Sequence, residues 1–79
     1  MSKLIEKRIN TKYFTLVKAH LKNFELVKDI DGVEPGDKIL FREWNGKEFT
    51  GRRFTRTVNH VTRNAEKYGL QEGYCIIGF

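Results

Sequence analysis

Four arginines gather in a stretch of the chain that contains no acidic residue. The seventeen residues from Phe49 to Ala65 include no aspartate and no glutamate. The basic residues of this stretch are Arg52, Arg53, Arg56, Arg63 and His60. The whole chain has 15 Lys and Arg and 10 Asp and Glu, so its formal net charge is +5. Without the four arginines, 11 basic residues remain against 10 acidic ones, so these arginines account for nearly all of the excess positive charge. A concentrated field of one sign attracts polyanions, which predicts a nucleic-acid partner.

A strand would divide these basic residues between two faces, because side chains alternate along it. One face carries Arg52, Phe54, Arg56, Val58 and His60, and the other carries Arg53, Thr55, Thr57, Asn59 and Val61. Phe54 and Val58 require burial, so we expect the first face to point inward. Arg56 lies between them, and an unpaired buried guanidinium is costly, so we expect Arg56 to reach a carboxylate, with Glu25 as the candidate, or to line an open cleft. The simpler interpretation is that the arginine stems lie along the surface and the charges serve solubility.

Lys22 and Glu25 are the candidates for catalysis, since a lysine beside a carboxylate in a cleft can transfer protons. Three positions apart on one strand, the two side chains would point to opposite faces. They converge only if Lys22 lies in the turn before the strand. The simpler interpretation is a pair of surface charges, or a pairing of Glu25 with an arginine.

Aromatic side chains beside basic groups bind single-stranded nucleic acid by stacking on bases. Trp44 and Tyr68 are the candidates for this role, although aromatics in so short a chain commonly belong to the core. His20 and His60 lack the spacing of metal ligands, and Cys75 is the only cysteine, so we expect no metal site, no internal disulfide and no cofactor.

Short strands separated by turn residues dominate the pattern. We expect strands over residues 4–9, 23–28, 38–44, 47–61 and 74–79, with Gly51 bending the long one into two pieces. Pro35-Gly36 fits a type II turn. Asn45-Gly46 predicts a type I′ hairpin turn, since both residues tolerate positive φ.

One helix is expected from Lys12 to about His20, with Thr11 as its N-cap and an apolar face formed by Phe14, Val17 and Leu21. A second short helical turn is expected over residues 63–68. Together these elements predict a single α+β, mainly β domain over residues 1–79, built as a small mixed β-barrel of five or six strands with one or two short helices. The charged N-terminus and the lack of an 18-residue apolar run predict a soluble, cytoplasmic protein without a membrane partner, and we expect a monomer.

Several segments resemble a known family. They are Tyr13-Phe14, Lys22-Asn23-Phe24-Glu25, Pro35-Gly36-Asp37-Lys38-Ile39-Leu40, Arg42-Glu43-Trp44, Phe49-Thr50-Gly51-Arg52 and Tyr68-Gly69-Leu70-Gln71-Glu72-Gly73-Tyr74. In this order they resemble an ASCH-like family of small bacterial and phage proteins over residues 3–79. The resemblance implies a PUA-like fold, with a helix between the first two strands, a cleft beside that helix, and RNA or modified nucleosides as ligands.

One relative in the ASCH group, the bacterial acetylcytidine amidohydrolase, is an enzyme with the motif Gly-x-Lys-x-x-Thr-x-Arg, and ASCH domains often have Glu in place of the Thr. In this chain Lys22 and Glu25 match that motif, whereas His20 replaces the glycine and Val27 replaces the arginine.

These observations leave three hypotheses for function. The first is an RNA-binding or other nucleic-acid-binding module with a basic cleft. Its contact residues would be Lys22, Arg52, Arg53, Arg56, His60, Trp44 and Tyr68. The second is an amidohydrolase-like enzyme acting on a modified nucleoside through Lys22 and Glu25. The third is an accessory domain that binds an acidic protein.

Overall fold

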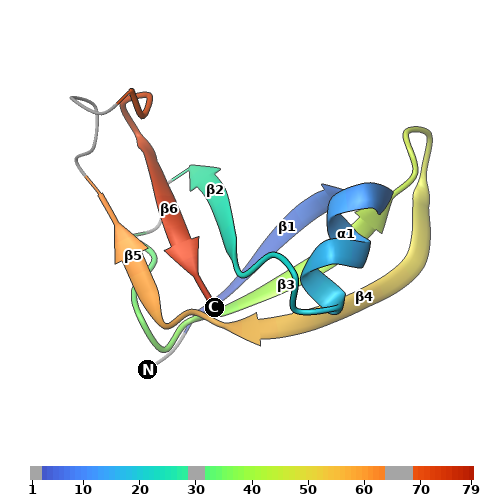
Figure 1. Ribbon diagram of the computed structural model, residues 1–79, viewed down its shortest axis with the longest axis horizontal. Helices are drawn as coiled ribbons and strands as arrows, with labels where there is room; N and C mark the ends of the chain where they lie inside the picture. The colour runs from blue at the N-terminus through green and yellow to red at the C-terminus, as the bar shows by residue number, and fades with distance from the viewer. Residues whose placement is uncertain (1–2, 29–31, 64–68) are drawn as a thin grey trace.

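Two small sheets and one helix make up the part of the chain that the computed structural model describes, residues 3–28, 32–63 and 69–79. The elements are β1 (Leu4–Asn10), α1 (Thr11–Lys18), β2 (Phe24–Lys28), β3 (Lys38–Trp44), β4 (Phe49–Thr57), β5 (His60–Thr62) and β6 (Tyr74–Gly78). One sheet has the strand order β1-β3-β4, with β1 parallel and β4 antiparallel to β3. The other sheet has the order β2-β6-β5 and is antiparallel. Figure 1 shows α1 lying against the β1-β3-β4 sheet.

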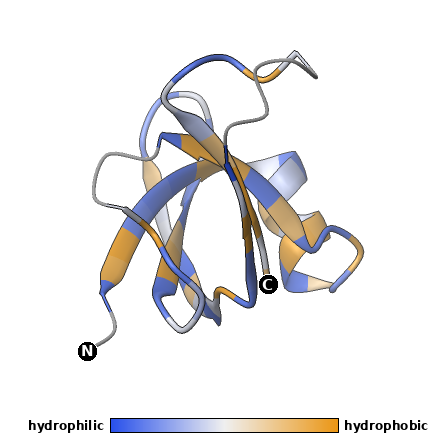
Figure 2. Ribbon diagram, turned by 90° about the vertical axis from the view of Figure 1, so that its left-hand side faces the viewer, coloured by the Kyte–Doolittle hydropathy of each residue, from blue (hydrophilic) through white to orange (hydrophobic). Residues whose placement is uncertain are grey.

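The core lies between α1 and the inner faces of the two sheets. Strand alternation produces it: Ile39 and Phe41 of β3 are buried, while Leu40 and Arg42, which alternate with them, are partly exposed. This alternation appears along the strands of Figure 2 as hydrophobic segments between hydrophilic ones. The buried residues are Ile9, Phe14, Val17, Val27, Val33, Ile39, Phe41, Val58, Cys75 and Ile77.

The architecture is therefore α+β and mainly β, as the sequence predicts. The six strands of the described residues form two open sheets, and they do not close into the expected barrel. The expected helical turn over residues 63–68 falls almost wholly outside the described residues. Arg63, the one residue of it that is described, has no helical structure.

The long basic strand divides at Val58 and Asn59. At Gly51, where the sequence predicts a bend, φ is +92° and the pairing with β3 shifts register, but β4 continues through this residue. The amide of Val58 donates to the carbonyl of Asp37 beside the first sheet, and the amide of Asn59 donates to the carbonyl of Gly78 in the second. The chain thus passes from one sheet to the other at this point. His60 consequently leaves the face that carries Arg52 and Arg56, which corrects the expectation that all three share it.

Helix α1 begins one residue earlier than expected and ends two residues earlier. Asn10, not Thr11, is the N-cap, and its side-chain oxygen accepts a hydrogen bond from the amide of Tyr13 at 2.9 Å. At the other end, His20 takes the left-handed conformation, with φ of +61°. The amide of Leu21 donates to the carbonyl of Leu16 at 2.9 Å, so the helix closes in a Schellman motif. Leu21 is therefore outside the helix and 77% exposed, contrary to its predicted place on the apolar face.

The two predicted turns have different outcomes. Gly36 has a φ of +97°, and the amide of Asp37 donates to the carbonyl of Glu34, which confirms the type II turn. The type I′ turn at Asn45-Gly46 is wrong, because Asn45 does not have the positive φ that it requires. Instead, the Asn45 side chain accepts hydrogen bonds from the amides of Lys47 and Glu48, and four residues separate the paired Trp44 and Phe49.

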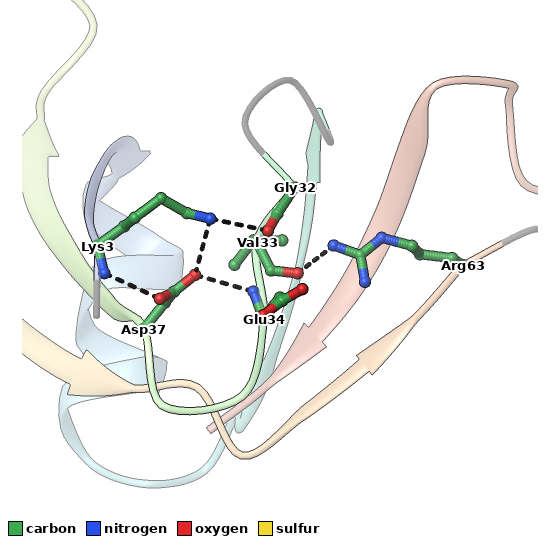
Figure 3. A network of polar contacts seen from close by, with 6 residues as sticks. All are labelled: Lys3, Gly32, Val33, Glu34, Asp37 and Arg63. Atoms are coloured by element: carbon green, nitrogen blue, oxygen red, sulfur yellow. Dashed lines mark hydrogen bonds and ion pairs between the residues drawn. The ribbon is translucent and has the colours of Figure 1, made fainter. Parts of the chain in front are cut away.

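Asp37 joins the start of β3 to the residue before β1. Its carboxylate is buried and accepts hydrogen bonds from the amides of Lys3 and Glu34, each at 2.9 Å, and lies 3.6 Å from the ammonium of Lys3 (Figure 3). The hydrogen bond from the Lys3 amide, followed by that from Glu34, lowers the pKa of Asp37 below its ordinary value of 3.8. Asp37 is thus a structural carboxylate that holds both strands in register.

Candidate nucleic-acid interface

Three arginines lie side by side across the outer face of the β1-β3-β4 sheet. Arg8 of β1 is directly opposite Arg42 of β3, and Arg42 is directly opposite Arg53 of β4. Directly opposed residues share one face of a sheet, so these side chains form one line across all three strands. We call Arg8, Arg42 and Arg53 the arginine row.

The position of the row follows from the alternation of β3. Its buried residues are Ile39, Phe41 and Glu43, so the residues between them, including Arg42, face away from α1 and the core. Arg53 is on the same outer face because it pairs with Arg42. Like charges placed directly opposite each other destabilise a sheet, so the row carries electrostatic repulsion that a bound anion would relieve.

Nearby groups offset part of this repulsion. Arg42 donates from Nη1 to Oε1 of Glu6 at 3.4 Å, and its Cζ lies 3.9 Å from the ring centroid of Phe49. The Cζ of Arg8 lies 4.8 Å from the ring of Trp44. The Arg53 side chain has neither a hydrogen bond nor an ion pair within the described part of the chain.

The two aromatic rings determine how the guanidinium groups are presented. Trp44 and Phe49 contact each other edge to face, with ring centroids 5.1 Å apart. A guanidinium that lies over a ring uses its flat face for that contact, and its N–H groups remain in the plane, where they bind phosphate oxygens in pairs. In this structure the ring of Trp44 contacts Arg8, and base stacking on Trp44 stays a prediction.

A cavity of about 210 Å³ lies next to the row, at the edge of the sheet formed by β4. Its lining residues are Arg42, Phe49, Gly51, Arg52 and Arg53. Arg52 reaches it from the opposite face of β4, where its Cζ lies 4.9 Å from the ring of Phe14 on α1. We call this cavity the arginine pocket.

Glu43 fixes the position of Arg52. The Glu43 side chain is 2% exposed, and its Oε1 accepts a hydrogen bond from the hydroxyl of Thr50 at 2.6 Å. The same oxygen lies 3.6 Å from Nε of Arg52, whose side chain is 54% exposed. The inner end of the guanidinium is therefore held by a buried carboxylate, while its outer nitrogens reach solvent.

Arg56 does not reach Glu25, which corrects the expected pairing. Its Nη2 donates to the carbonyls of Val17 and Lys18 at 3.3 Å each, and its Cζ lies 4.5 Å from the ring of Phe54. These carbonyls lie in the last turn of α1; that of Val17 also accepts from the amide of His20 at 3.1 Å, whereas carbonyls at a helix end generally lack partners within the helix. Arg56 thus completes the hydrogen bonding of the helix end and interacts favourably with its dipole.

Lys22 and Glu25 do come together. Lys22 lies before β2, in the position that their convergence requires, and its Nζ donates to Oε2 of Glu25 at 3.1 Å. The two side chains are only 15% and 14% exposed. The ammonium of Lys22 also lies 4.2 Å from the ring of Tyr13 and 5.4 Å from that of Phe24. The ion pair and the aromatic contacts hold the Lys22 side chain in place beside α1 and β2.

The other predicted contact residues are dispersed. His60 is exposed on the second sheet and hydrogen-bonds through Nε2 to the hydroxyl of Thr62 at 3.1 Å. Tyr68 lies outside the described residues. Arg63, which belongs to the acid-free stretch but is not one of the predicted contact residues, donates to the carbonyl of Val33. The lining of the arginine pocket contains Arg52 and Arg53 but not Lys22 or Arg56.

The acid-free stretch did not indicate Arg8, Arg42 or Glu43, because all three lie outside it. A usable signal for two of them is the alternation of β3: its even-numbered positions face outward and its odd-numbered positions inward, which puts Arg42 on the surface and Glu43 in the core. Arg8 has no comparable signal, because its neighbour is set by a parallel pairing between distant segments.

Within the described ranges, no cluster of three or more His, Cys, Asp or Glu side chains is arranged to hold a metal ion. In the same ranges no helix has both the length and the apolar character needed to span a membrane.

Comparison with known proteins gives a family without an assigned activity. Residues 6–79 match the family model described as a domain of unknown function, DUF3850. Over 62 residues the chain is 36% identical to a protein of Escherichia phage P2, the "Uncharacterized 12.9 kDa protein in GpA 3'region". The matched segment makes up 78% of this chain and 57% of the phage protein, so the chain spans a little over half the length of that relative.

Proposed function

The chain belongs to the DUF3850 family of domains of unknown function, and on that premise we propose that it is a nucleic-acid-binding module whose arginine row holds the phosphates of RNA. The observation that carries this proposal is the in-register alignment of Arg8, Arg42 and Arg53 on one exposed sheet face. Glu6 is the only acidic residue of β1, β3 and β4 on that face, and its carboxylate forms an ion pair with Arg42.

The geometry suits a chain of phosphates better than a single small anion. Adjacent strands lie about 4.8 Å apart, so the row extends about 10 Å from β1 to β4. Each guanidinium can bind a phosphate in bidentate fashion. Contacts of this kind position a nucleic acid without reading its sequence, so we expect low base specificity.

The preference for RNA rests on the resemblance to PUA-like domains. Two features of the fold support the finer assignment as a PUA-like domain: the helix between the first two strands and the mixed β1-β3-β4 sheet. The binding surface in our proposal is nevertheless the outer face of that sheet, since Arg56 and the Lys22–Glu25 pair beside α1 already have partners in the protein.

Salt-dependent binding tests the proposal. For single strands, log K falls with log salt with a slope of about −0.7 for each phosphate neutralised, so three arginines predict a slope of about −2. Raising the salt from 50 to 200 mM should then weaken binding of a labelled single-stranded RNA by about 20-fold. Arg8→Gln, Arg42→Gln and Arg53→Gln should each make the slope shallower by about 0.7.

Lys28→Gln provides the matched control, since it removes one exposed positive charge from the second sheet. It should leave the slope within experimental error. Failure to bind RNA at 50 mM salt, or the same slope change for Lys28→Gln as for Arg53→Gln, would reject the arginine row as the binding surface.

A second candidate, hydrolysis of a modified nucleoside, is favoured by one observation, the mostly buried Lys22–Glu25 pair against Tyr13. Incubation of the protein with acetylated nucleosides, followed by chromatography, tests it. Turnover that is lost in Lys22→Met but kept in Lys18→Met would support this activity. An inert wild-type protein would eliminate that class of substrate.

A further inference from the structure

We infer that the arginine pocket binds a terminal phosphomonoester, so that the protein distinguishes the phosphorylated end of an RNA from its interior. This inference rests on the proposed function and adds a specificity to it. It depends on the arrangement of Arg42, Arg52 and Arg53, which come from both faces of the sheet and line one cavity where β4 forms the sheet edge.

The free donors of these side chains point to an anion. Arg52 uses only Nε in its contact with Glu43, and both of its Nη atoms lack hydrogen-bond partners in the described residues. Arg42 uses Nη1 in its contact with Glu6, and its Nη2 has no partner there. The Arg53 guanidinium likewise has no hydrogen bond or ion pair within the described residues. Three arginines with unused guanidinium donors therefore line one small cavity.

The size of the cavity restricts its occupant. Sites for drug-sized molecules have volumes of about 300–1,000 Å³, and the arginine pocket, at about 210 Å³, is smaller. This volume accepts a phosphate group, and the attached nucleoside would remain outside. Gly51, which lines the pocket and has a φ of +92°, contributes no side chain to fill it.

The charge of the pocket favours a phosphomonoester over an internal phosphodiester. A monoester has three terminal oxygens and a charge of about −1.5 to −2 at pH 7, whereas a phosphodiester has a single negative charge. Three guanidinium groups can donate to all three oxygens, and arginine forks match this geometry in pairs. The flat arginine row lacks such convergence, so the pocket provides the discrimination and the row provides general affinity.

End-modified oligonucleotides test the inference. Three labelled RNA decamers of one sequence would be compared by fluorescence anisotropy: one with a 5′-phosphate, one with a 3′-phosphate and one with hydroxyls at both ends. We expect at least one phosphorylated decamer to bind about tenfold more tightly than the hydroxyl form. The two phosphorylated arms identify which end is recognised.

Two substitutions of Arg52 locate the preference. Arg52→Gln should reduce the ratio of the dissociation constants to about one. Arg52→Lys keeps a positive charge beside Glu43 and should also lose most of the ratio, because it lacks the planar fork. Arg52→Lys tests the pocket even if Arg52→Gln fails to fold. Lys47→Gln, which removes a charge from the same hairpin outside the pocket, should keep the full ratio.

Each remaining outcome is decisive. Equal binding of all three decamers would overturn the inference that the arginine pocket binds a terminal phosphate, but it would not contradict RNA binding by the arginine row. A preference for a phosphorylated decamer that survives both Arg52 substitutions would also overturn the inference about the pocket, because that preference would have to arise from another part of the protein. If no decamer binds at low salt, the proposed function itself fails.

Discussion

Replacing Arg56 with methionine separates a structural arginine from Arg53, the arginine of the same strand that we propose binds RNA. Arg56 donates two hydrogen bonds to the last turn of α1, and Met keeps the apolar stem beside Phe54 while removing the donors. A hydrogen bond from a charged group contributes about 1.5–3 kcal/mol. Both bonds here are 3.3 Å long, share one nitrogen and are partly exposed, so we expect a total loss of about 1–2 kcal/mol.

This loss is large enough to measure in a small domain. For 60–100 residues, 1 kcal/mol shifts the melting temperature by about 4–8 °C, so Arg56→Met should melt roughly 5–15 °C below the wild type. Thermal unfolding followed by circular dichroism, with urea unfolding at 25 °C, measures both quantities. The slope of log K against log salt for RNA should remain at its wild-type value.

Arg53→Met makes the same chemical change three positions earlier on β4, at a side chain without a protein partner in the described residues. We expect its stability to stay within about 0.5 kcal/mol of the wild type and its salt slope to become shallower by about 0.7. The reverse result, with a stable Arg56→Met that has lost RNA affinity and an Arg53→Met that melts early, would refute the assignment of the two residues.

Three further predictions concern stability. His20→Gly should stabilise the protein by about 0.5–1 kcal/mol in urea unfolding, because glycine accepts the φ of +61° at the end of α1, whereas His20→Ala should not. Asp37 has a lowered pKa in the folded state, so its contribution to stability is complete above its ordinary pKa of 3.8 and is lost as the pH falls through the folded value. The difference in unfolding free energy between the wild type and Asp37→Asn should therefore shrink from pH 6 to pH 3. A difference that stays constant over this range would contradict the linkage. Thr50→Val removes a donor from the buried carboxylate of Glu43 and should cost about 1–3 kcal/mol by the same measurement, and a neutral effect would show that this hydrogen bond is not required.

Local patterns predicted much of the fold. The expected strand over residues 38–44 coincides with β3, and the type II turn at Pro35-Gly36 forms as expected. Both depend on interactions among near neighbours, so the sequence contains the information directly. The prediction of a type I′ turn after Trp44 was wrong because the Asn45 side chain accepts hydrogen bonds from two backbone amides and favours a longer loop.

The candidate site was less predictable, because it depends on which strands become neighbours. The acid-free stretch contains Arg52 and Arg53, two of the residues that line the arginine pocket. The alternation of side chains along a strand then places Arg52 and Arg53 on opposite faces of β4. It could not show that Arg53 has Arg42 and Arg8 beside it, since strand pairing is a long-range property. The binding of Arg56 to the end of α1 was equally inaccessible, as it requires the helix to be placed on the sheet.

The most direct test of the central claim is an NMR titration of the arginine side chains with single-stranded RNA at low salt. Our account predicts that the Nε–Hε resonances of Arg8, Arg42 and Arg53 shift together in proportion to the bound fraction, while that of Arg56 stays in place. Shifts confined to Arg56 and to residues around Lys22, with Arg8, Arg42 and Arg53 unmoved, would contradict it.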